Sequence, residues 1–350
     1  MPIDDLPTPL MEHQTTVENA LRRHMDKAAA SGLPLYRMMQ YQLGWRDKDG
    51  LDEVLSVSTA PRVLGALCLE TAMSWGQGRD QEPFGLAAAA VELLRESVTV
   101  HEDMQSAEPH TQGRDAVWWV WGPAQAINVG DGLHALARLA VFNLLESGLS
   151  GDDVLAVVGD LDAAALRYYE GQYLELTFQE RIDITVDQYA QMARAKRGAL
   201  FGGALAAGAR VAGASPEAVG AFRAAGEHLG LASQIAEDIA LIWTEERESM
   251  KTGRLLNKSK LYPVVHALET GPVSRKRALG EIYFKRVMEP SDIEALRAIL
   301  DEAGVRGQAL DRAQSDAEMA IAMLEEVGLE PAAIARWREV AASLLSGPSD

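Results

Sequence analysis

The chain has 350 residues, of which 47 % are hydrophobic, and this composition excludes an intrinsically disordered protein. Its formal net charge of −18 excludes sequence-independent binding to nucleic acid, because such binding needs a positive surface. No apolar run is long enough to span a bilayer, and the N-terminus lacks the basic and apolar regions of a signal peptide. The single cysteine, Cys68, excludes an intrachain disulfide, so we expect a cytoplasmic protein without a membrane span.

Most of the chain has the hydrophobic period of an α-helix, interrupted by glycine, proline and serine. Residues 1–12 are rich in proline and acids and predict a flexible leader. Helices are then expected, in chain order, over residues 15–30, 35–45, 61–75, 84–106, 124–147, 152–179, 185–213, 215–248, 258–269, 272–287, 290–303, 306–327 and 330–345. Ser150 and Ser215 are typical N-caps for two of them. No stretch alternates with the period of a strand, so we expect no sheet.

The predicted helices belong to a single domain. No linker is long enough to divide them, and no internal repeat of solenoid length is present. We therefore expect one all-α domain over residues 13–345, followed by a short tail at 346–350.

Two adjacent pairs of acids, each on a long predicted helix, form the candidate site. The first pair is Glu102 and Asp103, and the second is Glu237 and Asp238. On a helix, residues i, i+1 and i+4 lie toward one face, so three acids with this spacing can share divalent cations such as Mg²⁺. Here the i+4 residue is serine after the first pair and leucine after the second. The alternative is that each pair is simply a solvated helix face.

The surroundings of the acid pairs favour the metal-binding interpretation. Five segments occur in order: Glu92–Gly132 with the first pair and AINVGD, EGQYLEL at 170–176, Tyr189–Lys196, SQIAED at 233–238, and NKSKLYP at 257–263. Together they resemble the trans-isoprenyl diphosphate synthase (polyprenyl synthetase) family over roughly residues 58–270. Five segments in the same order are much more specific than any one motif.

The resemblance implies the isoprenoid synthase fold, a large antiparallel helical bundle around a deep apolar cavity, usually as a homodimer. It also implies that the two acid pairs clamp an allylic prenyl diphosphate through Mg²⁺ ions, which assist its ionisation. On this basis, catalysis and metal binding are assigned to Glu102, Asp103, Glu237 and Asp238. Substrate binding is assigned to Lys196, Gln172, Gln234, Lys258, Arg62, Arg95, Ser97 and Val98.

The sequence departs from the family pattern at positions that handle phosphate. Thr111 and Gln112 stand where the family has an Arg-Arg pair. Of a basic segment expected near residues 58–63, only Arg62 remains, and Arg95 stands where the family has a histidine. Arg254 occupies a position where the resemblance implies an acid. The isopentenyl diphosphate site is therefore expected to be more altered than the allylic site.

The apolar side of the predicted cavity is altered less. In the family, the residues four and five positions before the first acid limit product length, and here these are the small residues Val98 and Ser97. This favours a deep cavity for a long prenyl chain. The alternative is that Ser97 only packs against another helix.

Three functions agree with these observations. The first is an enzyme that ionises an allylic diphosphate and then cyclises it, as a terpene synthase does, or transfers it to an unusual acceptor. The second is a chain-elongating synthase that uses isopentenyl diphosphate, with Arg62, Arg95 and Arg114 rebuilding the lost anion site. The third is a non-catalytic protein that binds prenyl diphosphates or forms a heteromer with an intact synthase.

Overall fold

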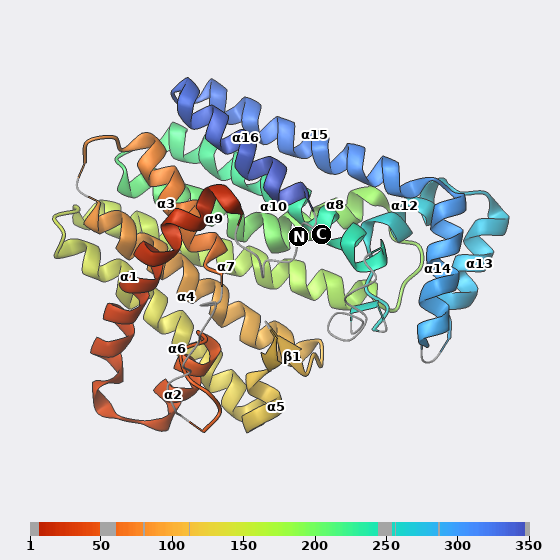
Figure 1. The fold of residues 1–350 in the computed structure, drawn as a ribbon, viewed down its shortest axis with the longest axis horizontal. Coiled ribbons are helices and arrows are strands. Elements are labelled where there is room, and N and C mark those ends of the chain that lie inside the picture. The colour runs from red at the N-terminus through yellow and green to blue at the C-terminus, as the bar shows by residue number, and fades with distance from the viewer. Residues whose placement is uncertain are drawn as a thin grey trace.

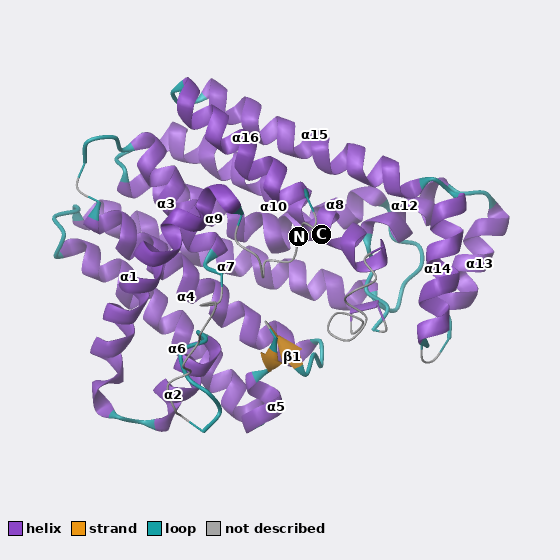
Figure 2. Ribbon diagram, viewed as in Figure 1, coloured by secondary structure: helices purple, strands orange, loops and turns teal. Residues whose placement is uncertain are grey.

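The computed structural model describes residues 7–49, 61–79, 81–111, 113–243, 254–255, 257–285 and 288–346. Helices dominate the described residues, which confirms the all-α prediction (Figures 1 and 2). In chain order the elements are η1 (Thr8–His13), α1 (Gln14–Ala28), η2 (Ala29–Ser31), α2 (Pro34–Gln42), α3 (Val63–Trp75), α4 (Glu82–Gln105), β1 (His110–Thr111), β2 (Arg114–Asp115), α5 (Val117–Trp121), α6 (Pro123–Phe142), η3 (Asn143–Leu145), α7 (Gly151–Phe178), α8 (Val186–Ala193), η4 (Arg194–Gly198), α9 (Ala199–Val211), α10 (Pro216–Trp243), α12 (Tyr262–Thr270), α13 (Val273–Tyr283), α14 (Pro290–Glu302), α15 (Val305–Glu326) and α16 (Pro331–Leu345).

Two helices begin at the serine N-caps that the sequence predicts. The Ser150 hydroxyl accepts the backbone N–H of Asp153 at 3.1 Å, at the start of α7. The Ser215 hydroxyl accepts the N–H of Ala218 at 3.2 Å, at the start of α10. Each bond satisfies one of the N–H groups that the first turn of a helix leaves without a partner. Both predicted N-caps are confirmed.

The core lies where α3, α4, α9 and α10 pack together, and it extends to α1, α6, α7, α15 and α16. A second apolar cluster lies among α12, α13 and α14, and the last two of these helices stand at one end of the molecule in Figure 1. Among the described helices, none is both long and apolar enough to cross a membrane. The candidate acid pairs are carried by α4 and α10, two of the helices that form this core.

Two short elements differ from the sequence expectation. Of the predicted leader, the structure describes residues 7–12, and Thr8–His13 forms a 3-10 helix in which Leu10 is fully buried. The prediction of no sheet was wrong for one antiparallel ribbon, His110–Thr111 with Arg114–Asp115. Each of its strands has only two residues, which is too short to show the alternation of a strand in the sequence. Gly113, between the strands, has a φ angle of 76°, which glycine adopts readily.

Some predicted elements lie partly outside the described residues. These are residues 244–248 at the end of one predicted helix, 286–287 at the end of another, and Ser58–Ala60 and Gln112. The helix predicted over 185–213 is continuous but changes its hydrogen-bond pattern, because Arg194–Gly198 is a π-helix between α8 and α9.

Glycines allow the helices that carry the site to approach closely. A Cβ atom at Gly171 of α7 would lie 2.5 Å from the backbone nitrogen of Lys196. A Cβ atom at Gly230 of α10 would lie 2.6 Å from the Cα atom of Gly198. Because real Cβ atoms do not come this close, only glycine permits these contacts. The close contacts of η4 with α7 and α10 bring basic residues of η4 next to acids of its neighbours.

Candidate functional site

A cavity of about 80 Å³ lies between the two acid pairs. Its polar wall contains the charged residues Arg95, Glu102, Lys196, Arg197, Glu237 and Arg254, together with Thr99, Tyr168 and Gln234. Its apolar wall consists of Leu64, Val98, Leu200 and Phe201. Pockets for small-molecule ligands usually measure roughly 300–1,000 Å³, so this cavity is much smaller than the deep one expected. Sequence reasoning considered only α4, whereas Phe201 and Leu200 of α9 also fill this space. The predicted depth stays a prediction.

The first acid pair divides between the cavity and the protein interior. Glu102 lines the cavity and accepts hydrogen bonds from Lys196 Nζ at 2.5 Å and Tyr168 Oη at 2.6 Å. Asp103 is buried, and its Oδ2 atom has no hydrogen-bond partner among the described residues. Burial, followed by the charge of Glu102, raises the pKa of Asp103 well above its usual range. Asp103 is thus held as a buried carboxyl whose environment favours its neutral form.

The second acid pair is engaged by arginines. Glu237 forms ion pairs with Arg197 and, at 3.6 Å, with Arg254. Arg197 also donates to the backbone oxygen and the hydroxyl of Ser233, at 3.3 and 3.1 Å. Both arginines line the cavity, so Glu237 faces it with its charge already neutralised.

Asp238 lies behind this wall, fully buried. It accepts hydrogen bonds from Tyr189 Oη at 2.5 Å, from the Tyr262 backbone N–H at 2.9 Å and from Gln234 Nε2 at 3.0 Å. Arg254 is 3.5 Å away. Burial raises the pKa of Asp238, although Arg254 acts in the opposite direction. Its oxygens are therefore used within the protein.

Glu175 connects the two pairs, and sequence reasoning did not assign it. Its carboxylate accepts hydrogen bonds from Lys196 and, at 3.1 Å, from Arg254. Burial opposes its ionisation, but the charges of Lys196 and Arg254 outweigh burial and lower its pKa to about 2. Its position could have been inferred from the sequence. Glu175 lies four residues after Gly171, and residues four apart on a helix share a face.

Arg197 is the second residue that sequence reasoning missed. It follows Lys196 directly, and adjacent residues of a regular α-helix point about 100° apart. Both residues lie in the π-helix η4, whose turn is wider, and both line the cavity. The residue types in this segment do not predict the change from an α-helix to a π-helix.

Two predicted basic ligands are held in a separate cluster. Arg62 is fully buried and donates to Glu18 at 3.0 Å, Glu96 at 3.1 Å and the Leu43 carbonyl at 2.5 Å. It does not line the cavity, because buried carboxylates hold its guanidinium elsewhere.

Arg95 belongs to the same cluster but also reaches the cavity. It donates to Glu92 and Glu96, each at 2.5 Å. Arg114, proposed as a replacement ligand, instead donates to the backbone oxygens of Tyr41 and Gln42. Of the three arginines expected to rebuild an anion site, only Arg95 lines the cavity.

The remaining predicted residues are divided between the cavity and other places. Val98 and Gln234 line the cavity. Ser97 and Gln172 are buried but do not line it. Lys258 lies away from it and donates to the backbone oxygen of Lys285.

The four predicted metal ligands do not fit a Mg²⁺ centre in this arrangement. Mg²⁺ binds carboxylate oxygens that are not already paired with a cation, in octahedral geometry. Glu102 and Glu237 are bound by Lys196 and Arg197, and the other two acids are buried away from the cavity. A metal ion would have to displace these ammonium and guanidinium groups.

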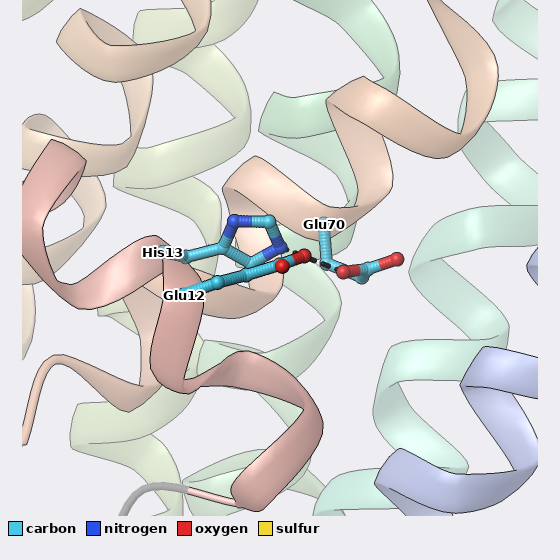
Figure 3. Close-up of side chains that lie close together, drawn as sticks. All are labelled: Glu12, His13 and Glu70. Carbon is cyan, nitrogen blue, oxygen red and sulfur yellow. Dashed lines mark hydrogen bonds and ion pairs between the residues drawn. The ribbon is translucent and has the colours of Figure 1, made fainter.

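A different cluster is the only one among the described residues in which three ligand atoms gather within 4.8 Å. It consists of Glu12 and His13 at the N-terminus and Glu70 of α3, as Figure 3 shows. His13 and Glu70 are 2.7 Å apart, and Arg336 of α16 donates to Glu70 at 2.6 Å and to Glu12. The Arg336 guanidinium already neutralises these acids, so we interpret the cluster as a structural contact between Thr8–His13, α3 and α16.

Known proteins match this chain over most of its length. A family model described as "Polyprenyl synthetase" matches residues 56–300, a range that includes both acid pairs. A geranylgeranyl diphosphate synthase from Mycobacterium tuberculosis is 31 % identical over 307 residues, covering 86 % of this chain and 85 % of the relative. A (2E,6E)-farnesyl diphosphate synthase from Mycobacterium bovis is 25 % identical over 309 residues, covering 87 % and 84 %.

The fold is also shared with solved structures. A polyprenyl synthetase from Streptomyces coelicolor A3(2) has a TM-score of 0.85 and 28 % identity, covering 98 % of this chain and 100 % of that chain. A geranylgeranyl pyrophosphate synthetase from Pyrococcus horikoshii has a TM-score of 0.81, covering 97 % of each chain. These similarities confirm the isoprenoid synthase fold.

Proposed function

Because the chain belongs to the polyprenyl synthetase family, we propose that it elongates an allylic prenyl diphosphate with isopentenyl diphosphate. The relatives are named for prenyl diphosphate products, which favours elongation over the cyclisation that sequence reasoning placed first. The observation that carries the proposal is the meeting of a polar wall and an apolar wall in one cavity.

The two walls suit the two ends of such a substrate. Prenyl transfer breaks the bond between the allylic carbon and the diphosphate oxygen, and the electron pair leaves with the diphosphate. Fixed positive groups lower the barrier by stabilising this developing charge. Lys196, Arg197 and Arg254 supply such groups, while Val98 and Phe201 supply apolar surface for the hydrocarbon. Lys196 is held in position by Glu102 and Glu175.

Turnover with defined substrates tests this function. The purified protein is incubated with geranyl, farnesyl or geranylgeranyl diphosphate, with and without isopentenyl diphosphate, in buffers with Mg²⁺ and with EDTA. We expect longer prenyl diphosphates, detected by mass spectrometry, only when isopentenyl diphosphate is present. Pyrophosphate release without isopentenyl diphosphate would instead support the terpene-synthase function. No turnover under any condition would leave a non-catalytic binding protein or partner subunit.

We also propose that the protein is a homodimer. Leu155, Leu166 and Tyr173 of α7 expose 63 %, 62 % and 69 % of their surface. Their spacings of 11 and 7 residues place them on one face of the helix. Leu139 and Phe142 of the neighbouring α6 are also exposed, at 52 % and 42 %. Exposed apolar surface of this kind usually marks an interface.

Light scattering after size-exclusion chromatography tests the assembly. We expect the mass of two chains, and the mass of one chain for the double variant Leu155→Glu, Leu166→Glu. A monomeric native protein that gains mass only after mixing with an intact synthase would support a heteromer instead. A cytoplasmic location stays a prediction.

A further inference from the structure

The cations of the polar wall already occupy the positions around the acids that a metal ion would need. Lys196 contacts Glu102, while Arg197 and Arg254 contact Glu237. These contacts come from α4, η4 and α10, together with Arg254. The arrangement is therefore built by the fold and does not come from one flexible side chain.

The polar wall carries an excess of positive charge. It contains four basic side chains, Arg95, Lys196, Arg197 and Arg254, and two acidic ones, Glu102 and Glu237. Behind the wall, Glu175 pairs with Lys196 and Arg254, and Asp238 lies near Arg254. The side chains that face the cavity itself still present more basic than acidic groups, which favours an anion there over a divalent cation.

The arginines have the donors for such an anion. A guanidinium carries five N–H donors in a planar fork that matches phosphate oxygens. The contacts of Arg197 described above use its two terminal nitrogens, and Arg254 contacts its acids through its terminal nitrogens as well. Each therefore has further donors for a ligand while its ion pairs persist.

We propose that this site binds the diphosphate group directly through Lys196, Arg197 and Arg254, without a requirement for Mg²⁺. The three basic groups neutralise Glu102 and Glu237 and contact the phosphate oxygens themselves. The site thus binds a diphosphate ester or free pyrophosphate as a metal-independent anion site. The identity of the anion rests on the proposed function, whereas the independence from metal rests on the ion pairs.

Isothermal titration calorimetry tests the proposal without any turnover. Inorganic pyrophosphate and the unreactive geranyl thiolodiphosphate are titrated into the full-length protein, once in EDTA and once in Mg²⁺. We expect dissociation constants that agree within about threefold between the two buffers. In EDTA, Arg197→Gln and Arg254→Gln are each expected to weaken binding about tenfold, the loss of one charge-assisted hydrogen bond.

The matched control is Arg138→Gln, which removes an arginine paired with Asp162 on the surface, outside the cavity. It is expected to leave both dissociation constants unchanged. Thermal unfolding of each variant by circular dichroism establishes that it is folded, and Arg197→Lys and Arg254→Lys replace any variant that is not. With the lysine variants, we expect weaker binding than wild type, because the planar fork is lost.

The outcomes separate this inference from the proposed function. Binding that appears only with Mg²⁺ would overturn metal independence and leave prenyl elongation intact. Equal binding in both buffers without any turnover would support the anion site and overturn the elongation function. Failure of both probes to bind in either buffer would overturn both.

Discussion

Helix α4 contributes residues to two clusters of basic and acidic side chains, and these clusters differ in what surrounds them. The buried cluster joins Arg62 and Arg95 to Glu18, Glu92 and Glu96. The side chains of Arg62, Glu92 and Glu96 are wholly buried, so this cluster is closed to ligands except where Arg95 reaches the cavity.

The cavity cluster joins Lys196, Arg197 and Arg254 to the acid pairs and lines an open space. The side chains of Glu102 and Arg254 are 31 % and 23 % exposed. The difference shows that the residue type does not decide a charge's role. A charge enclosed by carboxylates on all sides holds the fold together, and a charge with one open side can bind a ligand.

Breaking the buried cluster is expected to have the largest effect. Arg62→Ala removes a guanidinium and leaves the buried Glu18 and Glu96 without this partner. We expect a loss of about 3–5 kcal/mol in the free energy of unfolding, measured by urea denaturation. The control is Arg22→Ala, which removes the exposed partner of Glu18 and is expected to cost less than about 1 kcal/mol. Equal losses for both variants would contradict the distinction.

The ion pairs of the cavity cluster are expected to make the free energy of unfolding depend on pH. Glu175 has a pKa of about 2 in the folded protein, below its ordinary value of 4.5. Its ionised form is therefore favoured by folding, and it contributes stability that is present above pH 4.5 and is lost as the pH falls toward 2.

Glu175→Gln should remove this contribution. The stability difference between wild type and variant is expected to shrink as the pH falls from 7 to 3, measured by urea denaturation at each pH. Glu170→Gln, an exposed acid on the same helix, is the control and should show a small, constant difference. A constant difference for Glu175→Gln as well would count against the ion pairs at the cavity.

The apolar wall between the clusters allows a smaller effect on product length. Val98 lies on α4 between Arg95 and Glu102 and lines the cavity, whereas Ser97 is buried without lining it. Val98→Phe is expected to shorten the longest product by one prenyl unit, measured by mass spectrometry, and to cost about 1–3 kcal/mol through overpacking. Ser97→Ala should leave the product distribution unchanged. An unchanged distribution for Val98→Phe would mean that the chain enters elsewhere.

The smallest expected effect concerns Lys258, which lies outside both clusters. Its φ angle of 62° is in the left-handed region, where a side chain costs about 1 kcal/mol relative to glycine. Lys258→Gly is therefore expected to raise the free energy of unfolding by up to about 1 kcal/mol and to leave turnover within about twofold. A loss of turnover greater than tenfold would restore Lys258 to substrate binding.

Sequence reasoning predicted the fold well because its signals are local. Hydrophobic period, glycine and proline positions and serine caps each act within a few residues, and they correctly indicated the long helices. It failed at Thr8–His13, whose burial depends on contacts with distant segments, and at the ribbon around Gly113, whose two-residue strands are too short to show a period. Arg336, for example, holds the N-terminal helix from more than 300 residues away.

The site was predictable only in part. Residue spacing and the family resemblance together correctly predicted three residues of the cavity, Glu102, Lys196 and Glu237. Arg62 was assigned to substrate because it was a remaining arginine, but three distant oxygen atoms decide where it points. Arg197 could not be found, because its direction depends on a π-helix rather than on its own residue type.

That π-helix makes the number of residues in one turn important, and not only their identity. The five residues Arg194–Gly198 occupy a turn that a regular α-helix would form with fewer. Deleting one of them would let a regular α-helix form through this turn, and α8 and α9 would keep nearly the same orientation about the helix axis. The phenol of Tyr189 could then still face Asp238, but Lys196 and Arg197 could no longer both face the cavity. A single deletion in this turn should therefore leave the helices packed and still remove a basic group from the cavity, an effect that no change of residue type reproduces.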